Sequence, residues 1–454
     1  MRRKNNSSFG LLFVLVLLVG AGLYVYFSSM FERNAPIITM ENNNGYWNLK
    51  KPLKIKISDE SGIKSYKVIF HTKNGDKTLE YEKVLQPKKE LTITVEPIRG
   101  AYTMQDKSVD IIVDAQDTSK WNFFRGNVAQ KAFELKIDRK RPVINIVNNS
   151  YKISRGGSAL VIFNVKDKNL KNIYIESGKK HFHAEPFYKE GYYIALLAWP
   201  VTSDHFKATV VATDAAGNIA RAYVPLYLKD KTYLLSRITL SDKFLDGKIA
   251  ELSDVFDETQ GVSDRLKRFK IINEDVRAKN EKLIQKVTSP VPDTMISDFK
   301  IHPMYPLKDA AVVAHFGDHR KYYYHGDFIS QAYHLGLDMA SHAMAPIKTK
   351  NSGTVVFAGD NGLYGNNLII SHGLGLYTLY GHCSSFEVAK GDRVEPGEKI
   401  ANTGKTGYAM GDHLHFGVLV QGIEVRPQEW MDKEWIKLNI NDIIKSAKKT
   451  INEQ

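Results

Sequence analysis

HLGLD at residues 334–338 and HLHFG at residues 413–417 are the stretches that decide the fold of the C-terminal part of this chain. Between them lies YGH at residues 380–382. From about Tyr305 to Trp430 the chain is rich in glycine and short β-type runs, and ten of its fourteen histidines fall between His302 and His415. Short strands separated by glycine turns predict a compact β-domain. The concentration of histidine indicates a metal site.

The residue types in these stretches are those that zinc prefers, imidazole nitrogen and carboxylate oxygen. His334 and Asp338 can supply two ligands from one bend. Side chains of a strand alternate with period two, so His413 and His415 point to the same face. One of them can bind metal while the other faces a substrate. A lone H-x-H pair is usually a surface or core feature, but all three stretches occur in order within about 80 residues.

This segment resembles the catalytic domain of the lysostaphin-type (LytM-like) zinc endopeptidases. The resemblance covers a little over a quarter of the chain. It is carried by FG at 316–317, HLGLD at 334–338, API at 345–347, SGTVVFAG at 352–359, YGNNLIISHGLGLYTLYGH at 364–382, GDRVEPGEKIANTGKTG at 391–407 and GDHLHFGV at 411–418.

The resemblance implies one Zn2+ per site, held by His334, Asp338 and His415. It implies His382 and His413 as catalytic histidines that do not bind the metal. Zinc lowers the pKa of a bound water to about 7, which provides a nucleophile at neutral pH. One of the two histidines is expected to accept the proton of the water, and the other to stabilise the oxyanion or protonate the leaving amine. Which of the two is the base stays open.

Other polar residues near these stretches have weaker patterns. Tyr380 is expected to add a hydroxyl near the site. Cys383 follows a histidine and could be a nucleophile, but a small buried thiol is the preferred interpretation. His325 is expected to be structural or exposed, with lining the groove or occupying the metal transiently as the alternative. The remaining histidines without a ligand pattern are expected to be structural or exposed: His315, His319, His342 and His372.

The predicted fold class is mainly β. Residues 34–138 and 139–228 are predicted to be two tandem immunoglobulin-like β-sandwich modules, because alternating apolar runs recur between Asp, Gly and Asn turns. The repeat is visible in APII at 35–38 against RPVI at 141–144, and in IIVDAQDTSKWN against TVVATDAAGNIA. Such modules are spacers or binding surfaces, and the second use would give envelope proteins a docking surface.

The chain changes character after the modules. Residues 229–300 carry apolar residues at helical spacing and predict a helical connector, with Ser241, Asp242 or Ser263 as N-caps and prolines at 290 and 292 ending it. The antiparallel β peptidase domain is predicted at 301–432 and a helical tail at 433–454. The long connector directly upstream of the groove suggests that the preceding segments restrain the site.

The N-terminus carries a long apolar run. Residues 9–27 have no charged residue and are long enough to cross about 30 Å of hydrocarbon as a helix. Arg2, Arg3 and Lys4 precede the run, and this positive charge predicts that residues 1–8 are a cytoplasmic tail. A cleaved signal peptide is the rival interpretation, but its apolar region is usually shorter and ends in small residues.

Bulk properties agree with a site outside the cytoplasm. The net charge of +13 and pI near 9.3 favour a polyanionic neighbour: nucleic acid, anionic lipid or acidic cell wall. No zinc finger and no basic helix with base-reading residues is found, so nucleic acid is not expected as a partner. The single cysteine excludes an intrachain disulfide.

Taken with the resemblance, these observations predict a zinc-dependent peptidoglycan endopeptidase that hydrolyses peptide cross-links of the cell wall. A D,D-endopeptidase is favoured. A D,D-carboxypeptidase and a non-catalytic activator of other wall hydrolases are the alternatives. The expected location is the inner (cytoplasmic) membrane of a bacterium, single-pass, with the catalytic domain in the periplasm or outside.

Overall fold

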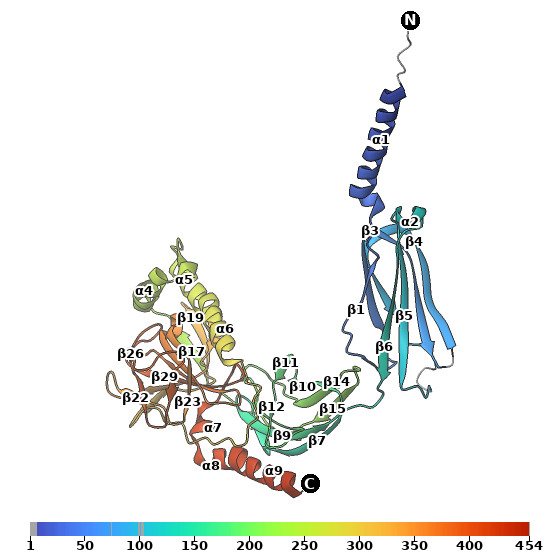
Figure 1. Cartoon of the computed structure of the whole chain (residues 1–454). Coiled ribbons are helices and arrows are strands. Elements are labelled where there is room, and N and C mark those ends of the chain that lie inside the picture. The colour runs from blue at the N-terminus through green and yellow to red at the C-terminus, as the bar shows by residue number, and fades with distance from the viewer. Residues whose placement is uncertain (1–6, 74, 99, 101–103, 454) are drawn as a thin grey trace. The chain divides into compact units, whose positions relative to one another are not determined.

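The computed structural model describes residues 7–73, 75–98, 100 and 104–453, which form two compact units (Figure 1). The N-terminal unit runs to Pro142 and includes the loop segments Asp167–Lys171 and Thr213–Ile219. The C-terminal unit contains the rest. The described residues are mainly β, which confirms the predicted fold class. The basic residues at 2–4 and the predicted cytoplasmic tail up to residue 6 lie outside the described residues.

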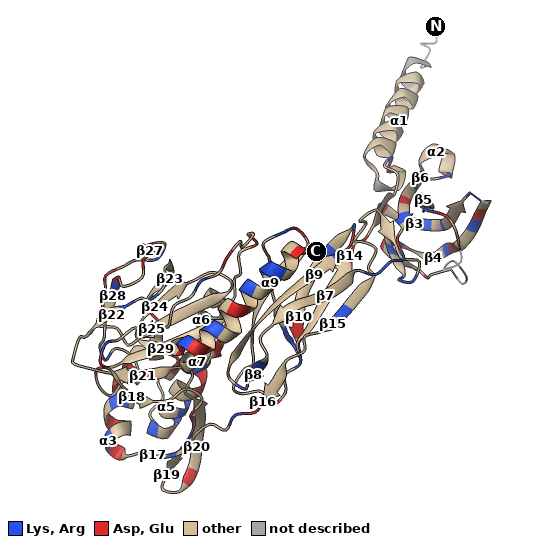
Figure 2. Cartoon of the chain, turned by 90° about the horizontal axis from the view of Figure 1, so that it is seen from below, with Lys and Arg blue, Asp and Glu red and all other residues tan. Residues whose placement is uncertain are grey.

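The N-terminal unit begins with the helix α1 (Ser7–Phe27), followed by the short turn η1 (Ser29–Phe31). The described part of α1 has no Lys, Arg, Asp or Glu, and its ribbon carries neither of their colours in Figure 2. Its segment Gly10–Phe27 has a mean hydropathy of 2.4 and is not buried against any described part of the chain. This helix is therefore apolar and long enough for a membrane span, a property that a signal sequence shares.

The rest of the N-terminal unit is a six-stranded sheet with the order β1-β3-β5-β6-β2 and with β4 paired to β3. Alternation is clearest in β5, where every second residue is buried. The buried residues form a core that includes Trp47, Ile55 and Val113. The elements are β1 (Ile37–Met40), β2 (Tyr46–Trp47), β3 (Leu53–Thr72), β4 (Gly75–Val95), β5 (Ser108–Asp117), α2 (Trp121–Phe124) and β6 (Val128–Ile137).

A second β region follows, with two four-stranded sheets in the orders β11-β10-β14-β15 and β12-β13-β9-β7. The sequence SALVIFNV of β9 is buried along its whole length, which is typical of a strand covered on both faces. The elements are β7 (Val143–Asn149), β8 (Lys152–Ser154), β9 (Ser158–Lys166), β10 (Leu170–Ser177), β11 (Lys180–Phe182), β12 (Glu185–Pro186), β13 (Tyr192–Ala198), β14 (Thr209–Asp214), β15 (Ile219–Tyr223) and β16 (Tyr227–Lys229).

The stretch predicted as a helical connector contains a strand as well as helices. β17 pairs in parallel with β19 of the following domain, so the connector begins as part of that domain's three-stranded sheet β17-β19-β20. Ser241 caps α3 as expected, whereas Asp264 and not Ser263 caps α5. The elements are β17 (Leu235–Thr239), α3 (Asp242–Phe244), η3 (Leu245–Ile249), α4 (Ala250–Val255), η4 (Asp257–Thr259), α5 (Arg265–Ile271), η5 (Ile272–Val276) and α6 (Arg277–Thr288).

The connector helices and the sheet share one core. Phe269, Ile272 and Val276 are fully buried and belong to the same apolar cluster as Tyr322 of β19. The Phe269 and Tyr322 rings meet edge to face, 5.1 Å between centroids. Figure 1 places α5 and α6 beside β17 and β19. The connector is therefore one wall of the domain and not a free linker.

The C-terminal domain is built on an eight-stranded sheet with the order β18-β21-β29-β25-β24-β23-β27 and with β30 paired to β29. The central strand β29 is buried throughout. The elements are β18 (Ala311–Ala314), β19 (His319–Tyr324), β20 (Asp327–Tyr333), β21 (Leu337–Ala340), β22 (Pro346–Lys348), β23 (Gly353–Asp360), η6 (Gly362–Tyr364), β24 (Asn366–Ser371), β25 (Leu376–Gly381), β26 (Ser385–Phe386), β27 (Arg393–Val394), β28 (Lys399–Asn402), β29 (Leu414–Val420) and β30 (Ile423–Val425).

The chain ends in helices that bind this domain to the second β region. The Ser158 backbone N–H donates to Glu429 Oε2 (2.9 Å), and Trp430 Nε1 donates to Ser158 Oγ (3.1 Å). Both Glu429 and Trp430 are buried. The last helix packs on β7 and β9. The elements are α7 (Pro427–Met431), α8 (Lys433–Ile436), η7 (Lys437–Asn441) and α9 (Asp442–Glu453).

Candidate active site

Three neighbouring strands of the large sheet bring the predicted ligands together. Asp338 in β21 lies directly opposite His415 in β29, and His415 lies opposite Gly381 at the end of β25 on its other side. His334 precedes β21 by three residues on the bend after β20, and His382 follows β25. The register of two strand pairs therefore positions residues that lie up to 81 positions apart in the sequence.

His334, Asp338 and His415 form a tight cluster whose ligand atoms all lie within 4.8 Å of one another. Asp338 Oδ1 lies 3.0 Å from His334 Nε2 and 2.8 Å from His415 Nδ1. The two ring nitrogens are 3.2 Å apart. Both histidines are buried, and the aspartate side chain is 13% exposed.

The hydrogen bonding of His334 shows that this cluster fits a metal ion. Its Nδ1 lies 2.9 Å from the His315 carbonyl oxygen and therefore donates a proton to it. A neutral ring then has only a lone pair at Nε2, which faces the lone pairs of the Asp338 carboxylate. Two acceptors at this distance repel each other unless a cation lies between them. Two imidazoles and one carboxylate are the donors of catalytic zinc sites, and a carbonyl partner on the second ring nitrogen is the usual support.

The surroundings shift the pKa values of this cluster. Burial alone would raise the pKa of Asp338, but the two adjacent imidazoles of His334 and His415 outweigh it and hold that pKa below its ordinary range. Burial lowers the pKa of His415. Burial and the neighbouring histidines lower the pKa of His382 to about 3. Neutral imidazole is the form that binds metal and accepts protons.

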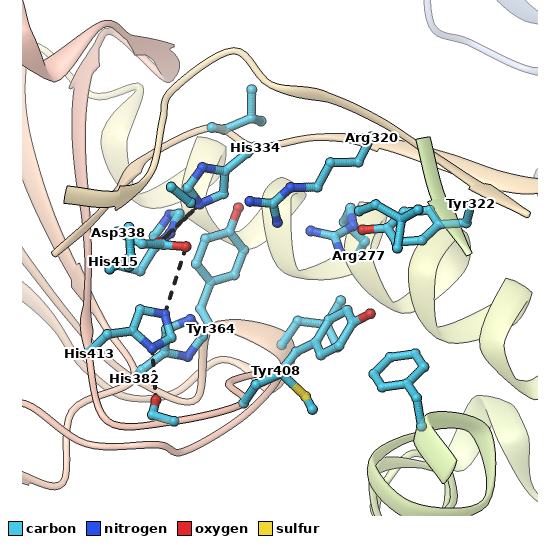
Figure 3. Close-up of a pocket in the computed structure, with 18 of the residues that line it drawn as sticks. Arg277, Arg320, Tyr322, His334, Asp338, Tyr364, His382, Tyr408, His413 and His415 are labelled. Carbon is cyan, nitrogen blue, oxygen red and sulfur yellow. Dashed lines mark hydrogen bonds and ion pairs between the residues drawn. The ribbon is translucent and has the colours of Figure 1, made fainter. Parts of the chain in front are cut away.

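His382 and His413 lie side by side next to the cluster, with ring centroids 4.7 Å apart (Figure 3). His382 Nδ1 is 2.8 Å from the Thr406 carbonyl oxygen, and His413 Nδ1 is 2.8 Å from the Gly411 carbonyl oxygen. Each ring therefore donates through Nδ1 and leaves Nε2 for other partners. His413 Nε2 lies 3.8 Å from Asp338 Oδ2.

A cavity of about 530 Å³ contains all five of these residues. Its wall includes Tyr364, a residue that the sequence did not single out. The Tyr364 ring meets His415 edge to face at 5.4 Å, and its hydroxyl points toward the metal cluster (Figure 3). The signal for Tyr364 was its place in GLYG, between two glycines with positive φ. Connector residues complete the wall: Ile238, Thr239, Leu240, Ser241, Phe244 and Arg277.

One expectation about a nearby residue is corrected. Tyr380 does not line this cavity, because its side chain is buried in the core beside Thr349 and Phe416. His325 is exposed, which agrees with the expectation that it is structural or exposed, and it does not line this cavity. Cys383 is fully buried, and burial raises the pKa of its thiol to about 12, so the preferred interpretation as a packing residue agrees with the structure.

The glycine inside HLGLD makes room for a ligand. A Cβ atom on Gly336 would lie 2.4 Å from both Cε1 and Nε2 of His415. No side chain fits there, because van der Waals contact begins about 1 Å further out. This glycine is therefore required by the ring that packs over it and not by a turn.

Comparisons with known proteins match the segment that carries this site. Residues 332–427 match Peptidase family M23. A stretch of 94 residues is 39% identical to the DD-carboxypeptidase/endopeptidase Mpg of Neisseria meningitidis serogroup B and covers 21% of this chain and 22% of that protein. A stretch of 89 residues is 37% identical to the peptidoglycan DD-endopeptidase ShyA of Vibrio cholerae, with 20% and 21% covered.

Among solved structures, a putative peptidase M23 from Pseudomonas aeruginosa aligns with a TM-score of 0.36 and 19% identity over 61% of this chain and 94% of that one. The matched segments span about a fifth of the length of the two curated relatives. The family match includes all five predicted site residues. The C-terminal domain of this chain, at residues 332–427, therefore belongs to peptidase family M23.

Proposed function

We propose that this chain is a zinc-dependent peptidoglycan hydrolase that cuts peptide cross-links of the bacterial cell wall. The observation that carries the proposal is the cluster of His334, Asp338 and His415 at the side of a cavity that also holds two imidazoles with free Nε2 atoms. The relatives named above, a DD-endopeptidase and a DD-carboxypeptidase/endopeptidase, support the substrate class. The D,D-endopeptidase reaction is the first candidate.

The ligands of the metal would be Nε2 of His334, a carboxylate oxygen of Asp338 and Nδ1 of His415. These are the atoms that converge in the cluster. Zinc, when bound there, supplies a Lewis acid that polarises the scissile carbonyl and makes water nucleophilic at neutral pH. The carbonyl oxygen of His315 would fix the tautomer and the orientation of His334.

His382 and His413 would handle the protons. Hydrolysis adds hydroxide to the carbonyl carbon and a proton to the leaving amine, so one group must accept a proton from water and one must protonate nitrogen. Both rings present Nε2 and are held by backbone carbonyls through Nδ1. One would act as the base, taking the proton of the water on Nε2 and giving it to the leaving nitrogen. The hydroxyl of Tyr364 would donate a hydrogen bond to the oxyanion, and the second ring would add another when its Nε2 is protonated.

We propose that α1 anchors the chain in the inner membrane with the catalytic domain outside. The support is the uncharged apolar helix and the net charge of +13, which favours anionic surroundings. Peptidoglycan lies on that side of the membrane. A cleaved signal sequence remains the alternative for α1. N-terminal sequencing of the chain recovered from membranes distinguishes the two, because cleavage would remove residues 9–27.

The test is digestion of two defined substrates by the zinc-loaded chain, a cross-linked muropeptide dimer and an uncross-linked pentapeptide monomer. A D,D-endopeptidase converts the dimer into monomers with the gain of one water for each cut. A D,D-carboxypeptidase releases alanine from the monomer. Neither product should form with His413→Ala. If zinc-loaded protein cleaves neither substrate, the enzymatic proposal is wrong and a non-catalytic activator is the better description.

A further inference from the structure

Two arginines lie in the wall of the active-site cavity and outside the segment that matches the family. Arg277 is the first residue of α6 in the connector, and Arg320 lies in β19. Both line the cavity that holds the metal cluster. Figure 3 shows their guanidinium groups next to each other, near the hydroxyl of Tyr364 and across from His382 and His413.

Arg277 is held by Asn273, which lies four residues earlier in η5. Its Nε donates to the Asn273 carbonyl oxygen (3.1 Å) and its Nη2 to Asn273 Oδ1 (3.0 Å). Asn273 is 1% exposed and is itself fixed by a hydrogen bond from its Nδ2 to Ser330 Oγ (2.8 Å). No carboxylate of the described residues lies within 4.0 Å of Arg277. Its orientation is thus fixed. Its charge acts on the buried Glu281 carboxyl, whose pKa burial raises and Arg277 lowers, but the two groups form no ion pair.

Arg320 is held in a similar way by a side chain. Its Nε lies 3.1 Å from Asp318 Oδ2, and Asp318 is 6% exposed. The other oxygen of Asp318 accepts a hydrogen bond from Ser236 Oγ (2.7 Å). This arrangement uses Nε and leaves the two terminal nitrogens of Arg320 facing the cavity without an acceptor among the described residues.

The chemistry of these groups indicates what they bind. A guanidinium group presents paired N–H donors that match the two oxygens of a carboxylate. Cations in a partly buried wall are costly unless an anion or water compensates them. The carboxylate of Asp338 belongs to the metal cluster, and Asp412 is engaged with Thr403 and the Met344 backbone. Asp318 engages only Nε of Arg320, and no ion pair forms between Glu281 and Arg277, so terminal N–H groups of both arginines are left for a carboxylate of the substrate.

We propose that Arg277 and Arg320 form a subsite for a free carboxylate of the substrate peptide. This inference rests on the proposed peptidase function and adds the reason for its selectivity. Two carboxylates of wall peptides share this chemistry, the side-chain carboxylate of a diamino acid in the cross-link and the terminal carboxylate of an uncross-linked stem. The connector then contributes to substrate recognition, because Arg277 lies on its last helix.

The test compares substrates that differ only in charge. The zinc-loaded full chain is assayed on a dimer with the free diamino-acid carboxylate and on the same dimer with a carboxamide. It is also assayed on a pentapeptide with a free C-terminus and on its C-terminal amide. The wild type should prefer one acid over its amide about 10- to 100-fold in kcat/KM, the range of one charged hydrogen-bonded contact. The pair that shows the preference identifies the carboxylate.

Arg277→Gln and Arg320→Gln should raise KM for that acid by about 10- to 100-fold, with a smaller change in kcat, and should leave the amide unaffected. Arg237→Gln is the matched control, since Arg237 is exposed on β17 and does not line the cavity. Zinc content and melting temperature are measured for every variant. Arg277→Lys keeps the positive charge but loses the paired N–H donors. Its KM for the acid should therefore lie between the KM of the wild type and that of Arg277→Gln.

The possible results distinguish a failure of the proposed subsite from a failure of the proposed function. Equal losses on acid and amide by both glutamine variants, with normal zinc content, would show that the arginines are structural and overturn the subsite. A wild type that cleaves every substrate without regard to charge would also overturn it while the proposed function stands. A zinc-loaded wild type that cleaves none of them removes the function and the subsite together.

A different surface lies beside the end of α1, in the N-terminal unit. The short helix α2 has the sequence WNFF, and the side chains of Phe123 and Phe124 are 92% and 72% exposed. Asn122, Phe123 and Phe124 all have positive φ, a conformation that costs about 1–2 kcal/mol for each such residue. The chain thus holds two large aromatic side chains outward in a strained turn.

This turn is fixed to the end of α1. The Lys120 N–H donates to the Met30 carbonyl oxygen (2.7 Å), and the Arg33 guanidinium lies 4.5 Å from the Trp121 ring and 4.8 Å from the Tyr26 ring. Aromatic and basic side chains in this combination are typical of the membrane interface.

We infer that the turn at residues 121–124 lies in the headgroup region of the bilayer that α1 would span, and that it fixes the N-terminal unit on an anionic lipid surface. The inference rests on the proposed anchor. Cys383 is buried, so a cysteine introduced at an exposed position can be labelled selectively. The full chain carrying Phe123→Cys is spin-labelled and reconstituted in nanodiscs that contain phosphatidylglycerol. The control is Leu85→Cys, treated in the same way, because the Leu85 side chain in β4 is 96% exposed.

The label at 123 should be accessible to oxygen and protected from a water-soluble nickel reagent, while the label at 85 should behave as in water. Equal aqueous accessibility at both positions would overturn the inference. If both labels behave as in water and α1 is found to be cleaved in cells, the proposed anchor fails as well. If α1 is retained, only the membrane contact of the turn fails.

Discussion

Replacing Gly336 by alanine should weaken zinc binding at least about 10-fold without unfolding the domain. The backbone of Gly336 does not have a positive φ, so alanine can adopt it without strain. The obstacle is the ring of His415, which would lie 2.4 Å from the new Cβ, followed by the Phe416 carbonyl oxygen at 3.0 Å.

The displacement can be worked out from these contacts. Ordinary contact begins at 3.4 Å, so the His415 ring must move by about 1 Å. Metal–ligand distances tolerate deviations of only about 0.2 Å. The movement would therefore take His415 Nδ1 out of its position 2.8 Å from Asp338 Oδ1. Disturbing a residue that merely supports a ligand costs about 10- to 100-fold in metal affinity, and moving the ligand itself should cost at least as much.

The assay is titration of the metal-free chain with zinc in competition with a chromophoric chelator, together with the melting temperature of the metal-free form. Gly359→Ala is the matched control, because the nearest atom to its new Cβ is Phe357 Cζ at 3.8 Å. The control should bind zinc as the wild type does. A Gly336→Ala chain with wild-type zinc affinity would refute the role that we assign to this glycine and to the position of His415.

Further predictions concern the catalytic pair, a buried carboxyl group and the connector. His413→Ala should keep one zinc per chain by mass spectrometry and lose cleavage, whereas His334→Ala should lose both; loss of zinc in both variants would contradict the assignment of roles. Burial raises the pKa of Glu429 from its ordinary 4.5 to about 7, so the stability that its neutral form contributes is full below about 4.5 and is lost as the pH rises through about 7. Glu429→Gln should remove this pH dependence of the free energy of unfolding, which amounts to at most about 3 kcal/mol between pH 5 and 8. Chemical denaturation at each pH measures it, and a variant with the same pH profile as the wild type would contradict the prediction. A chain that starts at residue 301 should be poorly soluble and less stable, because it lacks β17 and exposes the core shared with Tyr322, so truncation cannot serve as a simple test of restraint by the connector.

The five site residues could be predicted because their motifs resemble those of the LytM-like zinc endopeptidases, and all five line one cavity in the structure. HxH on a strand requires two side chains on one face, and in the structure both His413 Nε2 and His415 Nδ1 approach Asp338. The mainly β fold and the apolar helix follow from periodicity in the same way. What stays a prediction is the division into domains and the roles of the five residues.

The rest of the site depends on contacts between distant parts of the chain. Tyr364 and not Tyr380 reaches the cavity because the chain reverses at the positive-φ glycines around Tyr364. Arg277 carries no local signal, since an arginine on an amphipathic helix is usually solvated. Its place in the cavity results from the packing of Phe269, Ile272 and Val276 on the sheet, which only the folded chain shows.

Stepwise return of zinc to the metal-free chain, with cleavage of a cross-linked muropeptide dimer followed by mass spectrometry, tests the metal site and the activity together. We predict no cleavage before zinc is added, a linear rise in rate as zinc is added, and a plateau at one zinc per chain. Cleavage by the metal-free chain, or a fully loaded chain that leaves the dimer intact, would contradict the account.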